Sequence, residues 1–226
     1  MRNVFNFLAA FTAEYYYAIT YPFISKIFHP KIYRHPHPKG TIVLVGCWFN
    51  ANVYHNSWVS YLESQGFRTY LLNLPFARED FTTTTKRLAR FIAKHRLKNY
   101  TIVGISSGVL VCWNYLTTYK KWSEIHKFIS IGGPVQGTIT AWGIIFCSKG
   151  RDMVPGSPFI KYLQSKRIPK GKMVTLTAKF DELVPAKYAK LKGIKNYSLS
   201  GWGHNSFHLS NKDTYSIIVK LAGEKR

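Results

Sequence analysis

The sequence contains few cysteines and few acidic residues. The three cysteines, Cys47, Cys112 and Cys147, are odd in number and show no Cys-x-x-Cys spacing. Neither a disulfide framework nor a zinc site is therefore predicted, and Cys112, in the apolar run V-L-V-C-W, is expected to pack in the core. Acidic residues number only 10 and form no Asp-rich ligand loop, so a calcium site is not expected either.

The shortage of acids leaves a large positive charge. Lys plus Arg number 32, which gives a formal net charge of +22. Such a charge favours polyanions, either nucleic acid or an anionic membrane surface. The basic residues are spread over residues 86–98, 120–127, 161–172 and 187–195. They form no nucleic-acid-binding motif, so we expect mostly solvated faces, no specific nucleic acid and no obligate protein partner.

The chain also lacks a long uninterrupted apolar run. Residues 3–28 are rich in aromatics but include Glu14, Pro22 and Lys26, whereas a membrane-spanning helix needs about 20 apolar residues. No clean signal-peptide pattern is present either. We expect residues 1–30 to form a separate helical segment. It either lies in a membrane interface with its tyrosines at headgroup level or packs on the protein's own surface. The predicted location is membrane-associated or cytoplasmic, with secretion still open.

From residue 41 onward, short β-branched runs alternate with longer helical patterns. The predicted strands are residues 41–45, 67–74, 100–105, 127–131, 173–177 and 196–199, and the predicted helices are residues 54–65, 82–96, 107–119, 183–191 and 211–223. Strands alternating with helices favour a parallel sheet with right-handed crossovers. Residues 31–226 are therefore expected to form one α/β domain, with about six mostly parallel strands and helices on both faces.

One connection is much longer than the others. The interval between Ile131 and Met173 contains the apolar stretch I-T-A-W-G-I-I-F-C. Long connections of this kind are usually functional, so we expect a cap or lid at about residues 134–170, over the carboxyl ends of the strands. Trp142, Ile145 and Phe146 are its predicted substrate-binding residues.

The stretch Gly104-Ile105-Ser106-Ser107-Gly108 fits the pattern G-x-S-x-G. This pattern places a serine on a tight strand-to-helix turn, with its hydroxyl exposed. Serines beside glycines are also common in ordinary turns, so the motif alone leaves two interpretations, a nucleophile or a turn residue.

A nucleophilic serine needs a histidine base and a carboxylate that orients it. The segment A-K-F-D-E-L-V-P places Asp181 after a predicted strand, and L-S-G-W-G-H-N-S places His204 after the last one. Asp181 could instead cap a following helix, and His204 could be an ordinary loop residue. Because serine, acid and histidine follow separate strands in the required order, the catalytic interpretation is favoured. Glu182 and Asp152 are alternative acids.

These segments resemble those of the α/β-hydrolase superfamily, and within it small bacterial-type serine lipases and esterases. The elbow G-I-S-S-G, the acid segment, G-W-G-H, I-G-G-P-V-Q-G-T and D-M-V-P-G-S-P-F-I-K-Y-L all have counterparts there. The resemblance implies an oxyanion hole from the backbone N–H groups of Ser107 and Trp48. Gly46-Cys47 stands where the family usually has His-Gly, and Val135-Gln136 replaces His-Arg.

The resulting prediction is a serine hydrolase of the lipase or carboxylesterase type, which forms an acyl-enzyme on Ser106 and needs no metal or organic cofactor. Two other classes stay open. One is an acyltransferase or thioesterase that uses the same three residues. The other is a catalytically silent, basic membrane-binding protein on a hydrolase scaffold, because a fold does not by itself imply an activity.

Overall fold

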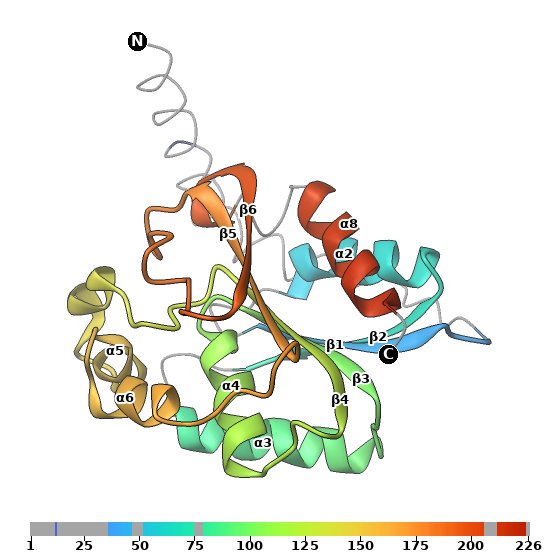
Figure 1. Ribbon diagram of the computed structural model, residues 1–226, viewed down its shortest axis with the longest axis horizontal. Coiled ribbons are helices and arrows are strands. Elements are labelled where there is room, and N and C mark those ends of the chain that lie inside the picture. The colour runs from blue at the N-terminus through green and yellow to red at the C-terminus, as the bar shows by residue number, and fades with distance from the viewer. Residues whose placement is uncertain (1–11, 13–35, 47–51, 75–78, 206–211, 225–226) are drawn as a thin grey trace.

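The structure, a computed structural model, describes residues 12, 36–46, 52–74, 79–205 and 212–224. Its centre is a six-stranded sheet with strand order β2-β1-β3-β4-β5-β6, in which every neighbouring pair is parallel (Figure 1). The strands are β1 (Gly40–Gly46), β2 (Phe67–Asn73), β3 (Tyr100–Ile105), β4 (Ile125–Ile131), β5 (Met173–Phe180) and β6 (Lys195–Trp202). All of the strands predicted from the sequence are present.

In the described part of the chain, the helices that cover the two faces of the sheet are α2 (Asn52–Ser64), α3 (Phe81–Lys94), α4 (Gly108–Thr118) and α8 (Lys212–Gly223). The α3 helix begins at the cap residue Asp80, whose side chain accepts the Thr83 N–H, and its buried residues recur on one face. The α4 helix is buried along most of its length, so it forms part of the core rather than an outer layer.

The core consists of two clusters, one on each face of the sheet. The first lies between the sheet and α3 and α4 and includes Val43 and Val45. The second lies between the sheet and α2 and α8 and includes Ile42 and Leu44. Successive residues of β1 thus point to opposite faces, and both faces are apolar because helices cover both. Cys112 is fully buried in the first cluster, as predicted.

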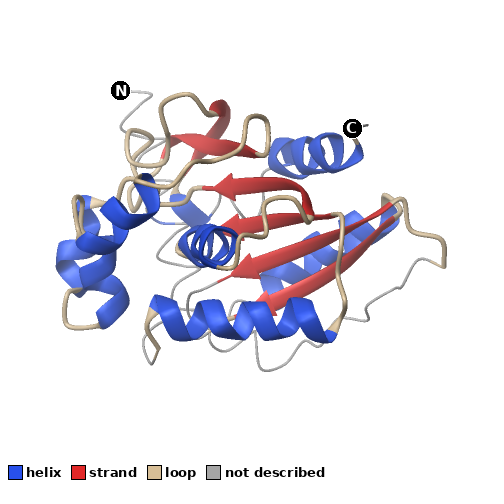
Figure 2. Ribbon diagram, turned by 60° about the horizontal axis from the view of Figure 1, so that its bottom comes forward, coloured by secondary structure: helices blue, strands red, loops and turns tan. Residues whose placement is uncertain are grey.

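The long connection between β4 and β5 contains η1 (Ile139–Ile144), α5 (Ser148–Met153) and α6 (Pro158–Gln164). Figure 2 shows helices of this connection on the side toward which the strand arrows point. Phe159 stacks on Phe81 of α3 with ring centroids 4.9 Å apart, and α6 also contacts α4. The connection is therefore anchored on the α3–α4 side. Its assignment as a cap stays a prediction.

The predicted helix at residues 183–191 is wrong. The segment forms successive turns instead, with Tyr188 N–H donating to Pro185 O and Ala189 N–H donating to Ala186 O. Its carbonyl groups are bound by another segment: Gln136 N–H donates to Tyr188 O, and the Gln136 side chain donates to Lys187 O and Lys190 O. Hydrogen bonds from a distant segment thus replace those that a helix would make.

The predicted N-terminal segment, residues 1–30, lies outside the described residues apart from Thr12. Within the described part of the chain, no helix combines the length and the apolar character needed to cross a membrane.

Candidate active site

Ser106 lies at the turn between β3 and α4, with a φ of 53°. A residue with a side chain rarely adopts this left-handed conformation, which costs on the order of 1–3 kcal/mol. The turn is held by the Ser106 N–H, which donates to Ile131 O at the end of β4 at 2.9 Å. Arg96, Asn99 and Lys120 share this conformation. Ser106 differs from them in that its hydroxyl contacts a buried histidine.

The two glycines of the motif are required by close packing. A Cβ atom on Gly104 would lie 2.6 Å from the Val109 Cα atom, and one on Gly108 would lie 2.2 Å from the carbonyl oxygen of Val45. Neither position can hold a side chain unless the backbone moves. The glycines thus allow α4 to begin directly against β3 and β1, which fixes where Ser106 projects.

Asp181 and His204 follow β5 and β6 at the same edge of the sheet. His204 Nδ1 lies 2.8 Å from Asp181 Oδ2 and 3.0 Å from Oδ1, and His204 Nε2 lies 2.9 Å from Ser106 Oγ. Both Asp181 and His204 are buried, at 5% and 3% exposure. The structure thus joins the three predicted residues in one hydrogen-bonded chain, although 98 positions separate Ser106 from His204 in the sequence.

The acid restricts the histidine to one tautomer. A carboxylate only accepts hydrogen bonds, so Nδ1 carries the proton that it donates to Asp181, and Nε2 is left to accept from the Ser106 hydroxyl. Asp181 Oδ1 also accepts from the N–H groups of Leu183 and Val184. No helix follows at residues 183–191, so the alternative in which Asp181 caps a helix is wrong. Its carboxylate instead holds the turn after β5 and orients the histidine ring. This arrangement has the geometry of an activated serine nucleophile.

Glu182, an alternative acid in the sequence analysis, has a different position. Its two carboxylate oxygens lie 3.0 and 3.2 Å from the His204 backbone nitrogen and accept that N–H. Glu182 thus holds the backbone of the histidine while Asp181 holds its ring. The sequence placed Glu182 beside Asp181 but gave no signal for this contact, which spans 22 positions.

The loop after Asp181 is fixed by side chains from the start of the long connection. The hydroxyls of Thr138 and Thr140 both donate to Leu183 O at 2.7 Å, and Gln136 binds the carbonyls further along the loop. Gln136, which replaces an arginine of the resembling enzymes, therefore has a structural contact here. The sequence contains no indication of these contacts, because a hydroxyl or amide side chain shows no sequence pattern that predicts which distant carbonyl group it will bind.

Asp152, the other alternative acid, lies in α5. Burial raises the pKa of this carboxyl, with Asp80 adding to the effect and Arg151 opposing it. The carboxylate that meets the His204 ring is that of Asp181. Among the described residues, no group of three or more His, Cys, Asp or Glu side chains is placed to hold a metal ion.

The remaining predicted site residues are those of the oxyanion hole and the substrate-binding residues. Ser107 is buried and directly precedes the first residue of α4, so its amide lies at a helix N-terminus, where anions are favoured. Trp48 lies outside the described residues. Trp142, Ile145 and Phe146 are exposed, at 61%, 42% and 79%.

No family model matches the sequence, and no curated protein does. Solved structures do match. A Bacillus licheniformis lipase in its mature form aligns with a TM-score of 0.61 and 15% identity, covering 86% of this chain and 96% of that one. A bromoperoxidase from Bacillus anthracis aligns at 0.60 and 18%, covering 83% and 94%. A Paleococcus ferrophilus monoacylglycerol lipase aligns at 0.62 and 13%, covering 85% and 97%. With its parallel sheet, serine turn and strand order, the chain has the α/β-hydrolase fold.

Proposed function

We propose that this chain is a serine hydrolase that cleaves carboxylic esters, in particular lipid esters, through a covalent acyl-enzyme. One observation carries the proposal: Ser106 Oγ, the His204 ring and the Asp181 carboxylate form a continuous hydrogen-bonded chain at 2.9 and 2.8 Å. The positive φ of Ser106 adds support, because strain of this kind concentrates at functional residues.

In the first half of the proposed reaction, Ser106 Oγ attacks the ester carbonyl carbon while His204 Nε2 takes the hydroxyl proton. Asp181 keeps the ring oriented and stabilises the imidazolium that forms. Collapse of the tetrahedral intermediate breaks the bond to the alcohol, which leaves with the proton from Nε2. In the second half, water attacks the acyl-serine by the same route, and the products are a carboxylic acid and free Ser106.

The oxyanion of each intermediate needs two backbone donors. In this proposal they are the N–H groups of Ser107 and Trp48. Ser107 is the residue directly after the nucleophile and adjoins the N-terminus of α4. A donor of this type contributes on the order of 3 kcal/mol to transition-state stabilisation.

The proposed substrate class follows from the exposed apolar side chains of the connection between β4 and β5. Ile145 and Phe146 are exposed, and their segment is tied through Thr138 and Thr140 to the loop that begins at Asp181. An acyl chain is the part of an ester that such side chains contact favourably. Two of the three structures described above are named as lipases, one of them a monoacylglycerol lipase, which is in keeping with a lipid ester.

The experiment is a chain-length series of p-nitrophenyl esters, from acetate to palmitate, with the wild-type chain and its Ser106→Ala variant. Wild type is expected to hydrolyse these esters and to prefer the longer chains, while Ser106→Ala loses at least about a thousandfold in kcat. Turnover that persists in the variant, or a folded wild type that hydrolyses none of the esters, would overturn the proposal.

The same series separates hydrolysis from acyl transfer. Each ester is incubated with water alone and then with added glycerol or a thiol as acceptor. Free carboxylic acid formed in water supports a hydrolase. Product that forms only with an added acceptor would identify an acyltransferase in its place.

A further inference from the structure

The structure has an unusual surface at η1. Ile139, Trp142 and Ile145 are exposed at 51%, 61% and 42%, and Phe146 at 79%. A 3₁₀-helix has three residues per turn, so side chains at spacings of three lie along one edge. Ala141, by contrast, is buried. The short helix therefore turns Ala141 and Ile144 toward the core and leaves the large apolar side chains of Ile139 and Trp142 exposed. We call these four exposed side chains the η1 ridge.

Most of the exposed large apolar side chains in the described part of the chain lie in the η1 ridge. The exposed large apolar side chains among the described residues are Tyr119, Ile139, Trp142, Ile145, Phe146, Tyr162 and Leu183. Most of them belong to the ridge, and Leu183 adjoins it because its carbonyl accepts from Thr138 and Thr140. Single exposed apolar residues are ordinary, but a contiguous group marks an interaction site.

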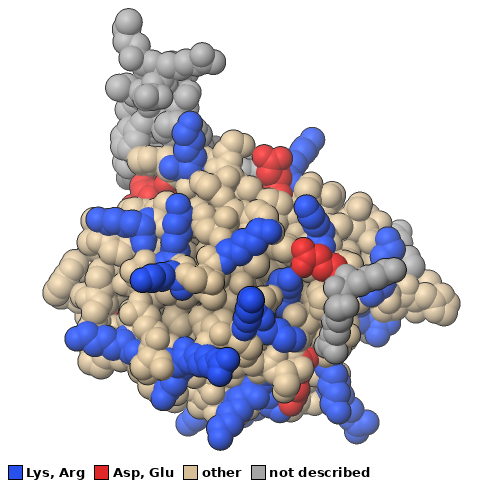
Figure 3. All heavy atoms as spheres, in the orientation of Figure 1, with Lys and Arg blue, Asp and Glu red and all other residues tan. Residues whose placement is uncertain are grey.

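Cations border the ridge. Arg151 is exposed, and its guanidinium donates to Ile145 O at 3.1 Å. Lys187 is exposed in the loop held by Gln136, and its Nζ lies over the Tyr188 ring at 4.8 Å. Of the acids in the adjoining segments, Glu182 accepts the His204 N–H, and Asp152 is half-buried beside Arg151. Figure 3 shows the same imbalance over a whole face, where basic side chains far outnumber acidic ones.

We propose that the η1 ridge docks on an anionic lipid surface, with Trp142 and Phe146 in the acyl–headgroup boundary and Arg151 and Lys187 at the headgroups. Tryptophan favours this boundary, and basic side chains beside an inserted apolar face add electrostatic attraction. A second copy of the chain fits less well, because it carries the same charge of +22 and would be repelled. This inference does not depend on the proposed hydrolysis.

The test uses full-length chain carrying Ser106→Ala, so that binding is measured without turnover. Flotation with vesicles of phosphatidylcholine alone, and with 30% phosphatidylserine, gives the partition coefficient. We expect at least about tenfold tighter binding to the phosphatidylserine vesicles, since each headgroup-level cation contributes on the order of fivefold. This difference should shrink when sodium chloride is raised.

The ridge variant is Trp142→Ser with Phe146→Ser. The control is Tyr119→Ser with Tyr162→Ser, which removes two less exposed aromatics outside the ridge, at 39% and 40%. The ridge variant is expected to bind at least about tenfold more weakly and the control less than twofold. Trp142→Phe keeps an aromatic ring and should bind like the parent, while losing the fluorescence quenching that brominated phosphatidylcholine causes in the parent. Thermal melting verifies that each variant is folded.

Four results would overturn the proposal: no binding of the parent chain to phosphatidylserine vesicles, ridge-variant binding within twofold of the parent, an equal loss in the control, or no quenching of the parent. Sedimentation velocity tests whether a second copy of the chain binds the ridge instead. A dimer that forms with the parent chain but not with the ridge variant would identify a contact between two copies. Hydrolysis of soluble p-nitrophenyl acetate by wild type is assayed separately, so a failure of docking and a failure of the proposed activity give different results.

Discussion

At the scale of single residues, two adjacent carboxylates divide the task of placing His204. Asp181 contacts the imidazole ring, and Glu182 contacts the backbone N–H of the same residue. An imidazole that must receive and return a proton at Ser106 needs both its tautomer and its position fixed. Glu182 is thus a positioning residue, which acts on the reacting atoms only through His204.

Substitution of Glu182 tests this role. Glu182→Ala removes a hydrogen bond to a charged acceptor, worth about 1.5–3 kcal/mol, so kcat is expected to fall on the order of tenfold to a hundredfold with little change in KM. Glu182→Gln keeps an acceptor oxygen and should recover most of the loss. Steady-state kinetics with p-nitrophenyl butyrate measures both, and a Gln variant as impaired as the Ala variant would contradict the positioning role.

Asp152 gives a prediction on pH. Because burial raises its pKa in the folded protein, the folded state binds this proton more readily than the unfolded state does. The free energy of unfolding therefore falls as pH rises through the range between the unfolded and folded pKa values. Asp152→Asn has no such proton, so it should match the parent at low pH and exceed its stability at neutral pH.

Urea unfolding of both chains over a pH series measures this difference. Ser157 Oγ donates to the main-chain oxygen of Asp152, and the Asn variant keeps that bond, so the comparison isolates the carboxyl. A difference in stability that is constant with pH, or that grows toward low pH, would show that the carboxyl is not destabilised by burial.

At the scale of elements, the junction of β3 with α4 determines where the nucleophile lies. The sheet and α4 approach so closely that a methyl group at Gly108 would meet the Val45 carbonyl oxygen at 2.2 Å. Gly108→Ala is expected to lower the free energy of unfolding by about 1–3 kcal/mol. Urea unfolding should show this loss.

Gly143→Ala is the matched control for Gly108→Ala. A Cβ atom there has no neighbour within 4 Å among the atoms described, so its effect should stay within about 0.5 kcal/mol. Equal effects of the two substitutions would mean that close approach of α4 to β1 does not require a glycine at residue 108.

The elements show how far the sequence can be read in physical terms. The strands were predictable because residues such as Val43, Leu44 and Ile102 form apolar runs that only a doubly covered sheet accommodates. Because Ser106, Asp181 and His204 follow three separate predicted strands in that order, the sequence also predicted that they lie at the same edge of the sheet. The segment 183–191 failed because its carbonyls bond to Gln136, Thr138 and Thr140, and local propensity contains no record of such distant partners.

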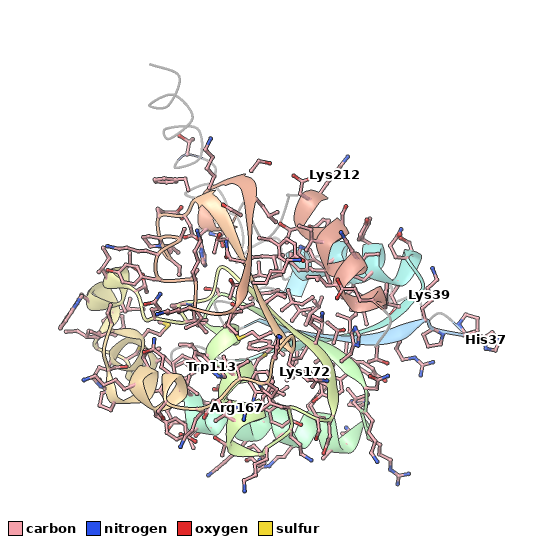
Figure 4. The ribbon with its side chains drawn as sticks, in the orientation of Figure 1. His37, Lys39, Trp113, Arg167, Lys172 and Lys212 are labelled. Carbon is pink, nitrogen blue, oxygen red and sulfur yellow. The ribbon has the colours of Figure 1, made fainter. Side chains whose placement is uncertain are left out.

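At the scale of the whole molecule, positive charge is widely distributed. Figure 4 labels Lys39, Arg167 and Lys212 in separate regions of the structure. Ion pairs between side chains include Arg87 with Glu79 and Lys127 with Glu224, but 10 acidic residues cannot neutralise 32 basic ones. Surface pairs contribute little to stability, so the excess charge repels itself in the compact state.

This repulsion predicts a salt effect on stability. Sodium chloride between 0.05 and 0.5 M shortens the Debye length from about 14 Å to about 4 Å, so the thermal midpoint is expected to rise by several degrees over that range. Calorimetry in a buffer at neutral pH measures it. A thermal midpoint that stays constant or falls would mean that the net charge of +22 does not destabilise the folded state.

The most direct test of the central claim, an activated serine, is labelling with a fluorophosphonate, which reacts with nucleophilic serines. Wild type is compared with Ser106→Ala and His204→Ala, and mass spectrometry locates the modified residue. We predict stoichiometric labelling at Ser106 in wild type and loss of labelling in both variants, because Nε2 of His204 must accept the proton from Ser106 Oγ. Folded wild-type chain that remains unlabelled in buffer and with lipid vesicles, or labelling on another residue, would contradict the account.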